Sequence, residues 1–210
     1  MRFNLCIVCL LLLSPFALLG QRVVREHSVS ASWGGEIPSG KSFLSHVSWV
    51  VPQMRYEYVV IPQLSVTGSA TYSYGKEPGM INEKYDGDFV TGNSIRSLSS
   101  FPLQLGLSYF PLGGKTALVQ PYLAVSGGSN YAKFYITGDF INSCKTSNWS
   151  GMFSAGLGIR YYIPYSDRIF LDINGTYQYA GNKLTKIDSD AQQGFLVRIG
   201  AGFRFGLLKR

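Results

Sequence analysis

Three features are scarce in this 210-residue sequence: charged side chains, cysteine and long apolar runs. Charged residues make up 15% of the chain, although the formal net charge is +7. The basic residues form no run or stripe, so the positive charge does not predict a nucleic-acid partner. Beyond residue 20 no segment approaches the roughly twenty apolar residues of a membrane-spanning helix, which excludes such a helix there.

Cysteine and histidine are too few for a disulfide framework or a metal centre. Of the three cysteines, Cys6 and Cys9 lie in the apolar N-terminal run and Cys144 stands alone. The sequence therefore predicts no intrachain disulfide and no cysteine metal site. His27 and His46 are too far apart to form a pair of metal ligands, so we expect neither a metal nor a cofactor.

The first twenty residues have the composition of a secretory signal peptide. Arg2 supplies a positive charge, and residues 5–13 form an apolar run that is too short to span a bilayer. Polar residues begin at Gln21. We predict that residues 1–20 are a cleaved signal peptide and that residues 21–210 form one exported domain.

The sequence is rich in period-2 alternation and in aromatic residues, which make up 14% of the chain. In residues 60–74 apolar side chains occupy the even positions and small hydroxyl side chains most of the odd ones. Because side chains alternate faces along a strand, this segment predicts a strand with one apolar face. The alternation predicts eight strands, at about residues 27–33, 43–51, 60–74, 101–109, 117–125, 149–161, 169–179 and 195–205.

The predicted connections alternate in length. Short turns are expected near residues 52–56, 110–116 and 163–168, and long polar loops near 76–94, 129–147 and 181–193. Short turns at one end and long loops at the other are typical of outer-membrane barrels. The sequence thus predicts an all-β fold, an eight-stranded antiparallel up-and-down transmembrane β-barrel with short periplasmic turns and long outer loops.

A soluble periplasmic ligand-binding barrel of the lipocalin kind is the structural alternative. Its polar face would meet water and should be rich in Lys and Glu. Here the polar face consists mostly of Ser, Thr, Gly, Gln and Tyr, which suits the crowded lumen of an eight-stranded barrel. Aromatic residues gather at the strand ends, as in the girdles of a membrane barrel. The membrane barrel is therefore the prediction.

Four segments rich in glycine and aromatic residues carry a resemblance to a known family. They are residues 110–114 (FPLGG), 119–128 (VQPYLAVSGG), 154–162 (SAGLGIRYY) and 200–205 (GAGFRF). The chain resembles the small outer-membrane β-barrel domain proteins of Gram-negative bacteria, the OmpA-barrel-like or porin-family class. This resemblance implies location in the cell outer membrane, contact with its lipid, and insertion by the outer-membrane barrel assembly machinery. That machinery recognises an aromatic end of the last strand, here Phe205, although residues 206–210 follow it.

Residues 35–42, GEIPSGKS, match the P-loop pattern G-x-x-x-x-G-K-[ST]. A working P-loop follows a buried parallel strand and precedes a helix. Here the flanking residues alternate as in a half-polar strand before the match and are β-branched and aromatic after it. We interpret the stretch as the first outer loop of the barrel, with Lys41 as a solvated charge.

Charged residues on the polar face predict an ion cluster in the lumen. The strand registers expected across the turn at 163–168 and the loop at 181–193 place Arg160 and Arg204 diagonally opposite Asp172. Charges in a narrow dry lumen must pair, because an unpaired buried ion is costly. We interpret the cluster as a network that plugs the barrel, and a gate that opens a small ion path is the alternative. The predicted cluster consists of Arg160, Asp172, Arg204, Arg198, Glu26 and Glu57.

Catalytic candidates are few. His46 with Ser45 or Ser48 is the only combination that would suit a lipid-hydrolysing barrel enzyme, and no carboxylate is placed beside it. We predict no catalytic residues, and keep an enzyme acting on outer-membrane lipid as the alternative. The predicted function is a non-enzymatic outer-membrane protein that serves envelope structure, surface interaction or minor permeability. Loops 76–94 and 129–147 mix charge with aromatic residues and are the candidates for contact with an extracellular protein or glycan.

Overall fold

The structure is a computed structural model, and it describes most of the chain after residue 25. The predicted signal peptide, Lys41 and His46 lie outside the described residues. No helix in the described part of the chain is long and apolar enough to cross a membrane. The described residues are 26–39, 44, 47–85, 88–112, 118–138, 141–166, 168–181 and 192–206.

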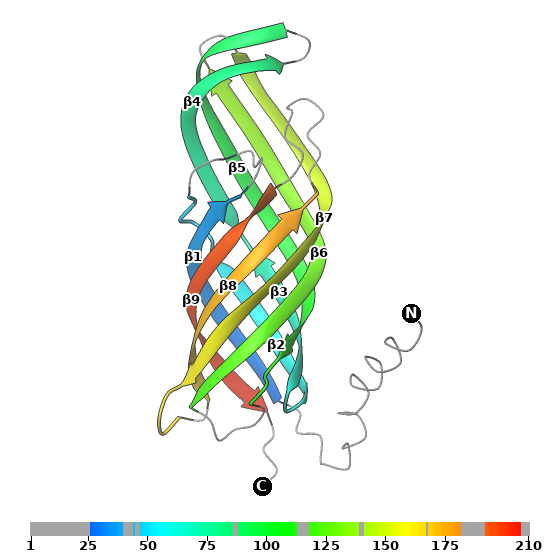
Figure 1. Ribbon diagram of the computed structural model, residues 1–210, viewed down its shortest axis with the longest axis vertical. Helices are drawn as coiled ribbons and strands as arrows, with labels where there is room; N and C mark the ends of the chain where they lie inside the picture. Colours follow the sequence, from blue (N-terminus) through cyan, green and yellow to red (C-terminus); the bar gives the residue numbers. More distant parts are fainter. Residues whose placement is uncertain are drawn as a thin grey trace, which may run out of the picture.

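Over these residues the chain forms antiparallel strands that close into a ring of eight (Figure 1). β3 and β4 act as one barrel strand with only Tyr72 between them, and β3 closes the ring by pairing with both β2 and β5. The predicted all-β, eight-stranded antiparallel barrel is confirmed. The strands are β1 (Glu26–Pro38), β2 (Gln53–Ile61), β3 (Leu64–Thr71), β4 (Ser73–Tyr85), β5 (Asp88–Tyr109), β6 (Val119–Gly138), β7 (Ile141–Tyr162), β8 (Ile169–Ala180) and β9 (Gln192–Gly206).

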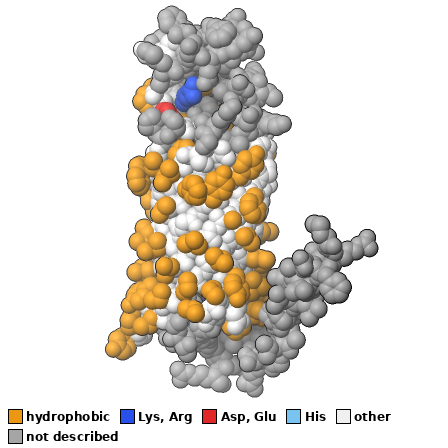
Figure 2. Space-filling model, in the orientation of Figure 1, with side chains coloured by type: hydrophobic (Ala, Val, Ile, Leu, Met, Phe, Trp, Pro, Cys, Tyr) orange, Lys and Arg blue, Asp and Glu red, His pale blue; other side chains and the backbone are white. Residues whose placement is uncertain are grey.

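The ring is apolar outside and polar inside. On β5, Leu105 is 73% exposed on the outer wall, whereas Ser108 is fully buried in the lumen. Figure 2 shows apolar side chains spread over the wall of the barrel, with the visible charged side chains above them. A water-soluble protein would have the opposite arrangement, so the outer wall is built to face lipid.

Aromatic side chains lie on the outer wall near both rims of this apolar band. On β7, Trp149 is 60% exposed near one rim and Tyr161 is 39% exposed near the other, twelve residues along the strand. At about 3.3 Å per residue and a tilt of about 40°, they are roughly 30 Å apart along the barrel axis. This separation matches the apolar thickness of a membrane.

The predicted second strand and first turn were wrong. The observed strand β2 occupies residues 53–61, where we expected a turn, and the chain turns at residues 62–63, inside the predicted strand 60–74. Within 43–51 the described residues form only isolated bridges, at Ser48 and Val50. The alternation of β2 was not recognised because its inward side chains include charged residues. The turn was missed because Pro62 fits the apolar pattern of β3.

The stretch that matched the P-loop is only partly a loop. Residues 35–38 belong to β1 and pair with β9, with Pro38 opposite Gly194, while residues 40–42 lie outside the described part. Glu36 points into the lumen and is 5% exposed, and Ile37 points outward and is 48% exposed. The strand pairing therefore continues through Gly35 and Pro38, which had indicated a loop.

Two of the predicted long loops are mostly strand. β4 ends only at Tyr85 and β5 begins at Asp88. In the same way, β6 ends at Gly138 and β7 begins at Ile141. β7 pairs with β8 only from Met152 onward, so its first part lies beside β6 alone. Residues 73–85, 88–100, 132–138 and 141–148 thus form a four-stranded extension, the projecting sheet, which rises above the ring (Figure 1).

Candidate functional site: the luminal ion network

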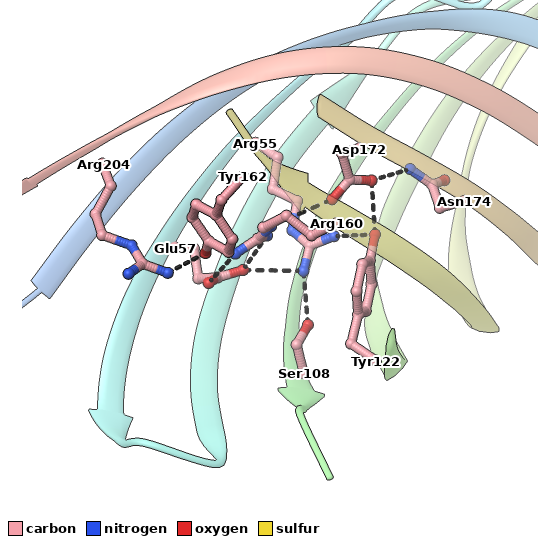
Figure 3. A network of polar contacts seen from close by, with 9 residues as sticks. All are labelled: Arg55, Glu57, Ser108, Tyr122, Arg160, Tyr162, Asp172, Asn174 and Arg204. Carbon is pink, nitrogen blue, oxygen red and sulfur yellow. Dashed lines mark hydrogen bonds and ion pairs between the residues drawn. The ribbon is translucent and has the colours of Figure 1, made fainter. Parts of the chain in front are cut away.

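The central feature of the lumen is a set of ion pairs formed by Arg55 and Glu57 of β2, Arg160 of β7 and Asp172 of β8. We call these four residues the central ion cluster. Arg160 Nη1 lies 3.0 Å from Glu57 Oε1, and Nη2 lies 3.0 Å from Oε2 (Figure 3). Both side chains are almost completely buried. A bidentate pair of this kind is strong and directional, and it joins β2 to β7 across the barrel.

Asp172 and Arg55 extend this pair into a network. Asp172 Oδ2 lies 3.5 Å from Arg160 Nε, and its Oδ1 accepts hydrogen bonds from the Tyr122 hydroxyl at 2.8 Å and from Asn174 Nδ2 at 2.9 Å. Arg55 Nη2 lies 3.2 Å from Glu57 Oε2, so two guanidinium groups share this carboxylate. The network links β2, β6, β7 and β8 (Figure 3).

Aromatic rings enclose the Arg160 guanidinium. Its Cζ lies 4.2 Å from the ring centre of Phe170 and 5.1 Å from that of Phe110. A desolvated cation over a ring contributes about 2 kcal/mol. Two glycines make room for the rings, because a Cβ at Gly158 would lie 2.4 Å from Tyr122 Cζ and one at Gly202 would lie 2.2 Å from Phe170 Cζ.

Arg204 lies away from Asp172, in contrast to our expectation. Its Nη1 is 3.7 Å from Glu26 Oε2, and it donates a hydrogen bond to the Tyr162 hydroxyl. The observed register places Arg160 directly opposite Asp172 and places Gly200 opposite Asp172 on the other side. The expected register was wrong by two residues in both hairpins, β7–β8 and β8–β9, so Arg204 lies nearer the periplasmic rim than expected.

Arg198 also lies apart from the carboxylates of the central ion cluster. It is 7% exposed, and it donates hydrogen bonds to Asn174 Oδ1 at 3.1 Å and to Thr176 Oγ1 at 3.2 Å. Among the described residues no carboxylate oxygen lies within 4.0 Å of its guanidinium. The predicted set of six residues is therefore divided over three levels of the lumen.

Three luminal residues, Arg55, Glu36 and Tyr122, were missing from the predicted site. Arg55 lay in the expected turn and Glu36 in the expected loop. A signal was available for Arg55, because it precedes Glu57 by two positions and must share its face in any strand. Tyr122 was on the polar face of its predicted strand, but nothing in the sequence indicated its hydrogen bond to Asp172.

Glu36 forms a second polar centre nearer the outer rim. Its Oε2 accepts a hydrogen bond from Ser73 Oγ at 2.7 Å, and its Oε1 accepts bonds from Gln178 Nε2 at 2.8 Å and Gln192 Nε2 at 3.4 Å. All these donors are neutral. Above them the side chains of Leu44, Leu98, Ala132, Phe134 and Ile136 form a buried apolar cluster under the projecting sheet.

The outer face of the projecting sheet carries exposed lysines just above the aromatic rim. Lys76, Ser97, Tyr135 and Lys145 lie side by side across β4, β5, β6 and β7. Lys133 lies in the next row, and its Nζ is 5.5 Å from the ring centre of Tyr131. We call Lys76, Lys133 and Lys145 the lysine face. All three are exposed.

The described residues provide no group of three or more His, Cys, Asp or Glu side chains that could hold a metal ion. Of the residues considered for lipid hydrolysis, Ser48 is buried and pairs with Glu36 through its backbone, while Ser45 and His46 lie outside the described residues. Cys144 lies on β7 opposite Ile136.

Comparison with solved structures shows which fold this is. Ail from Yersinia pestis, crystallised with the heparin analogue sucrose octasulfate, is 20% identical over 87% of this chain and 99% of its own, with a TM-score of 0.52. OprG from Pseudomonas aeruginosa is 14% identical over 89% of this chain and 98% of its own, with a TM-score of 0.56. The N-terminal barrel domain of OprF from the same organism is 18% identical over 88% and 100%, with a TM-score of 0.51.

The fold is that of the small eight-stranded outer-membrane barrels. This agrees with the resemblance noted in the sequence. At these identities the likeness concerns the fold and not the activity. No protein-family model matches the chain, and no curated protein matches it in sequence.

Proposed function

We propose that this chain is a non-enzymatic protein of the outer membrane whose lumen is closed and whose projecting sheet binds anionic saccharides at the cell surface. The observation that carries the proposal is the lysine face, with its three exposed lysines directly above the aromatic rim. Cations at this height meet the phosphate and sulfate groups of saccharides that lie on or above the membrane. The basic–aromatic pair of Lys133 and Tyr131 is suited to sugar rings with anionic substituents.

The outer-membrane location is supported by the arrangement of the two faces. An apolar outer wall with aromatic rims is expected for a lipid-embedded barrel and unfavourable for the soluble lipocalin-like alternative. We expect residues 1–20 to be removed on export, and the assembly machinery to recognise the end of β9 at Phe205. Replacing Phe205 by alanine should lower the amount of folded barrel in the membrane, as measured by heat-dependent migration on a gel.

The closed lumen is supported by the central ion cluster and by the apolar cluster above it. Arg160 and Glu57 join opposite walls, and eight strands enclose only enough space for side chains. We therefore expect little or no conductance from the chain in planar bilayers, and structural and adhesive roles in preference to permeability.

The ligand class is supported by charge and by one neighbour of the same fold. Ail was crystallised with a polysulfated heparin analogue. The chemistry that would recognise such a ligand here is a set of lysine ammonium groups next to aromatic rings. Two kinds of molecule could supply such a ligand: an outer-leaflet glycolipid with phosphate groups, and an extracellular polysaccharide with sulfate groups.

Binding of sucrose octasulfate to the folded chain in detergent micelles, measured by calorimetry, tests the proposal. Lys133→Gln should weaken binding about threefold or more, and the triple change of Lys76, Lys133 and Lys145 should abolish it. Arg168→Gln removes an exposed charge at the opposite rim and serves as the control. Equal binding by the triple variant and the unchanged chain would refute a role for the lysine face.

The same variants distinguish the two sources. If the ligand is a glycolipid, vesicles that contain lipopolysaccharide should stabilise the unchanged chain more than phosphatidylcholine vesicles do, and the triple variant should lose that difference. If it is a polysaccharide, only soluble heparin fragments should show the effect.

A further inference from the structure

A small cavity lies in the middle of the lumen, between the central ion cluster and the Glu36 centre. Its volume is about 40 Å³. One water molecule needs about 10–15 Å³ on this measure, so the space admits roughly three waters or one monatomic ion with some water. The cavity is lined chiefly by polar side chains, among them Arg55, Arg198, Gln53, Gln104, Tyr122 and Thr176.

The charged groups that line this cavity are all positive. Arg55 and Arg198 both reach it, and no Asp or Glu is among the described residues that form its wall. The carboxylates nearby are engaged elsewhere: Glu57 is bound by Arg160 and Arg55, and Asp172 by Arg160, Tyr122 and Asn174. The hydrogen bonds of Arg198 go to neutral oxygens of Asn174 and Thr176.

Of the two arginines that line the cavity, Arg55 contacts a carboxylate, that of Glu57, and Arg198 contacts none among the described residues. The other luminal carboxylates do not contact Arg198 either, because Glu26 pairs with Arg204 near the periplasmic rim and Glu36 is held by neutral donors toward the outer rim. An uncompensated charge in a poorly solvated lumen is costly.

We propose that the cavity between Arg55 and Arg198 binds one small inorganic anion of the halide class, such as chloride. The wall supplies what an anion requires, namely guanidinium N–H groups, hydroxyls and amide N–H groups. Gln53 Nε2 donates one hydrogen to Thr71 and Gln104 Nε2 donates one to Ser154, and each amide nitrogen has a second hydrogen to offer. The volume favours a monatomic ion over phosphate or sulfate.

Such an ion would neutralise Arg198 and bind only the folded barrel. Ligands of this kind raise stability in proportion to the logarithm of their concentration. The inference is independent of the proposed saccharide binding, which depends on the outer face of the projecting sheet.

Crystals of the folded chain grown or soaked in sodium bromide provide the direct test. We expect an anomalous bromide peak between the Arg55 and Arg198 guanidiniums, and a melting temperature in detergent that is higher in sodium chloride than in sodium gluconate of the same ionic strength. Arg198→Gln should abolish the peak and weaken chloride binding about tenfold or more, because charge-assisted hydrogen bonds are roughly twice as strong as neutral ones. Arg204→Gln, which changes an arginine outside the cavity, should leave both effects in place.

Water alone in the cavity at high bromide concentration would overturn the proposal, and so would an unchanged chloride effect in Arg198→Gln. The bromide test on the unmodified chain does not depend on any variant. If Arg198→Gln fails to fold, Thr176→Val keeps the arginine while removing a hydroxyl from the wall, and it should reduce bromide occupancy several-fold. Full occupancy in that variant would also contradict the proposed site.

Discussion

β5, β6 and β7 run through both the ring and the projecting sheet, and the polarity of their two faces is opposite in the two regions. Within the ring, β6 places Tyr122 in the lumen and Leu123 toward lipid; within the projecting sheet, the same strand turns Phe134 inward and Lys133 outward. Even-numbered side chains point inward in both regions, but the medium outside the strand changes from lipid to water. Where the outside is lipid the apolar face is external, and where it is water the apolar face is internal. One strand therefore changes its polarity at the membrane surface.

The two regions also differ in how their interiors are held together. The ring depends on a buried ion pair between opposite walls, whereas the projecting sheet depends on an apolar cluster beneath one face. In the ring each strand has two neighbours, while at the end of the projecting sheet β7 has only one. We expect the ring to unfold as a unit and the projecting sheet to open locally.

The largest effect is expected from Glu57→Ala. It leaves Arg160 buried without its bidentate partner, and breaking a buried pair in this way costs about 3–5 kcal/mol. The free energy of unfolding, measured by urea titration in lipid vesicles, should fall by that amount.

The control is the double variant Glu57→Leu with Arg160→Met. It removes both charges of the bidentate pair, so the part of the loss that comes from the unpaired Arg160 should return, while Arg55 and Asp172 each lose one partner. A double variant that is less stable than Glu57→Ala would show that the pair itself, and not the orphaned charge, determines the stability of the ring.

The next effect concerns the outer wall. Leu105→Arg places a charge near the middle of the lipid-facing band and should cost about 2–4 kcal/mol. Ile95→Arg makes the same change on the same face of β5 within the projecting sheet, where water meets the surface, and should change the stability by less than about 0.5 kcal/mol. Equal costs in urea titrations would mean that the membrane boundary lies elsewhere.

A smaller effect is expected from Glu36→Gln. This carboxylate has neutral hydrogen-bond partners, and glutamine retains one acceptor oxygen, so the loss should be about 1 kcal/mol. A loss as large as that of Glu57→Ala would indicate that the Glu36 charge has a cationic partner in the folded barrel.

The smallest effect on global unfolding is expected from Phe134→Ala. The side chain is 2% exposed, but it belongs to the apolar cluster of the projecting sheet. Hydrogen exchange should accelerate at the β6 amides around Ile136 and remain unchanged around Leu123, while the free energy of global unfolding changes by less than about 0.5 kcal/mol. A change in exchange along the whole strand would show that the two regions unfold together.

Much of the barrel could be predicted from the sequence because the alternation of side chains between the two faces of a strand is a local property. The alternation of Leu103, Leu105 and Leu107 with polar residues is sufficient to identify a strand with one lipid-facing side. The alternation was not recognised where the inward residues were charged, as in β2. It was also missed where the medium outside the strand changed, as in the projecting sheet. There the alternation inverts, so that a long hairpin has the composition of a polar loop.

Only part of the membership of the ion network could be predicted. Glu57, Arg160 and Asp172 were all expected to face the lumen, since that follows from parity. Their partners were not predictable, because the contact of Glu57 with Arg160 joins strands that are not neighbours in the ring. Such contacts depend on the register of every hairpin between them, and an error of two residues in one register was enough to misplace Arg204.

The sequence by itself determined the class of fold and the division into a lipid face and a lumen face. Those properties arise from a period of two that each segment carries alone. Only the tertiary structure decided which charges meet, how far the sheet projects and where the lumen holds a cavity between two arginines. Closure of the ring sets those distances, because it aligns residues that are separated by most of the length of the chain.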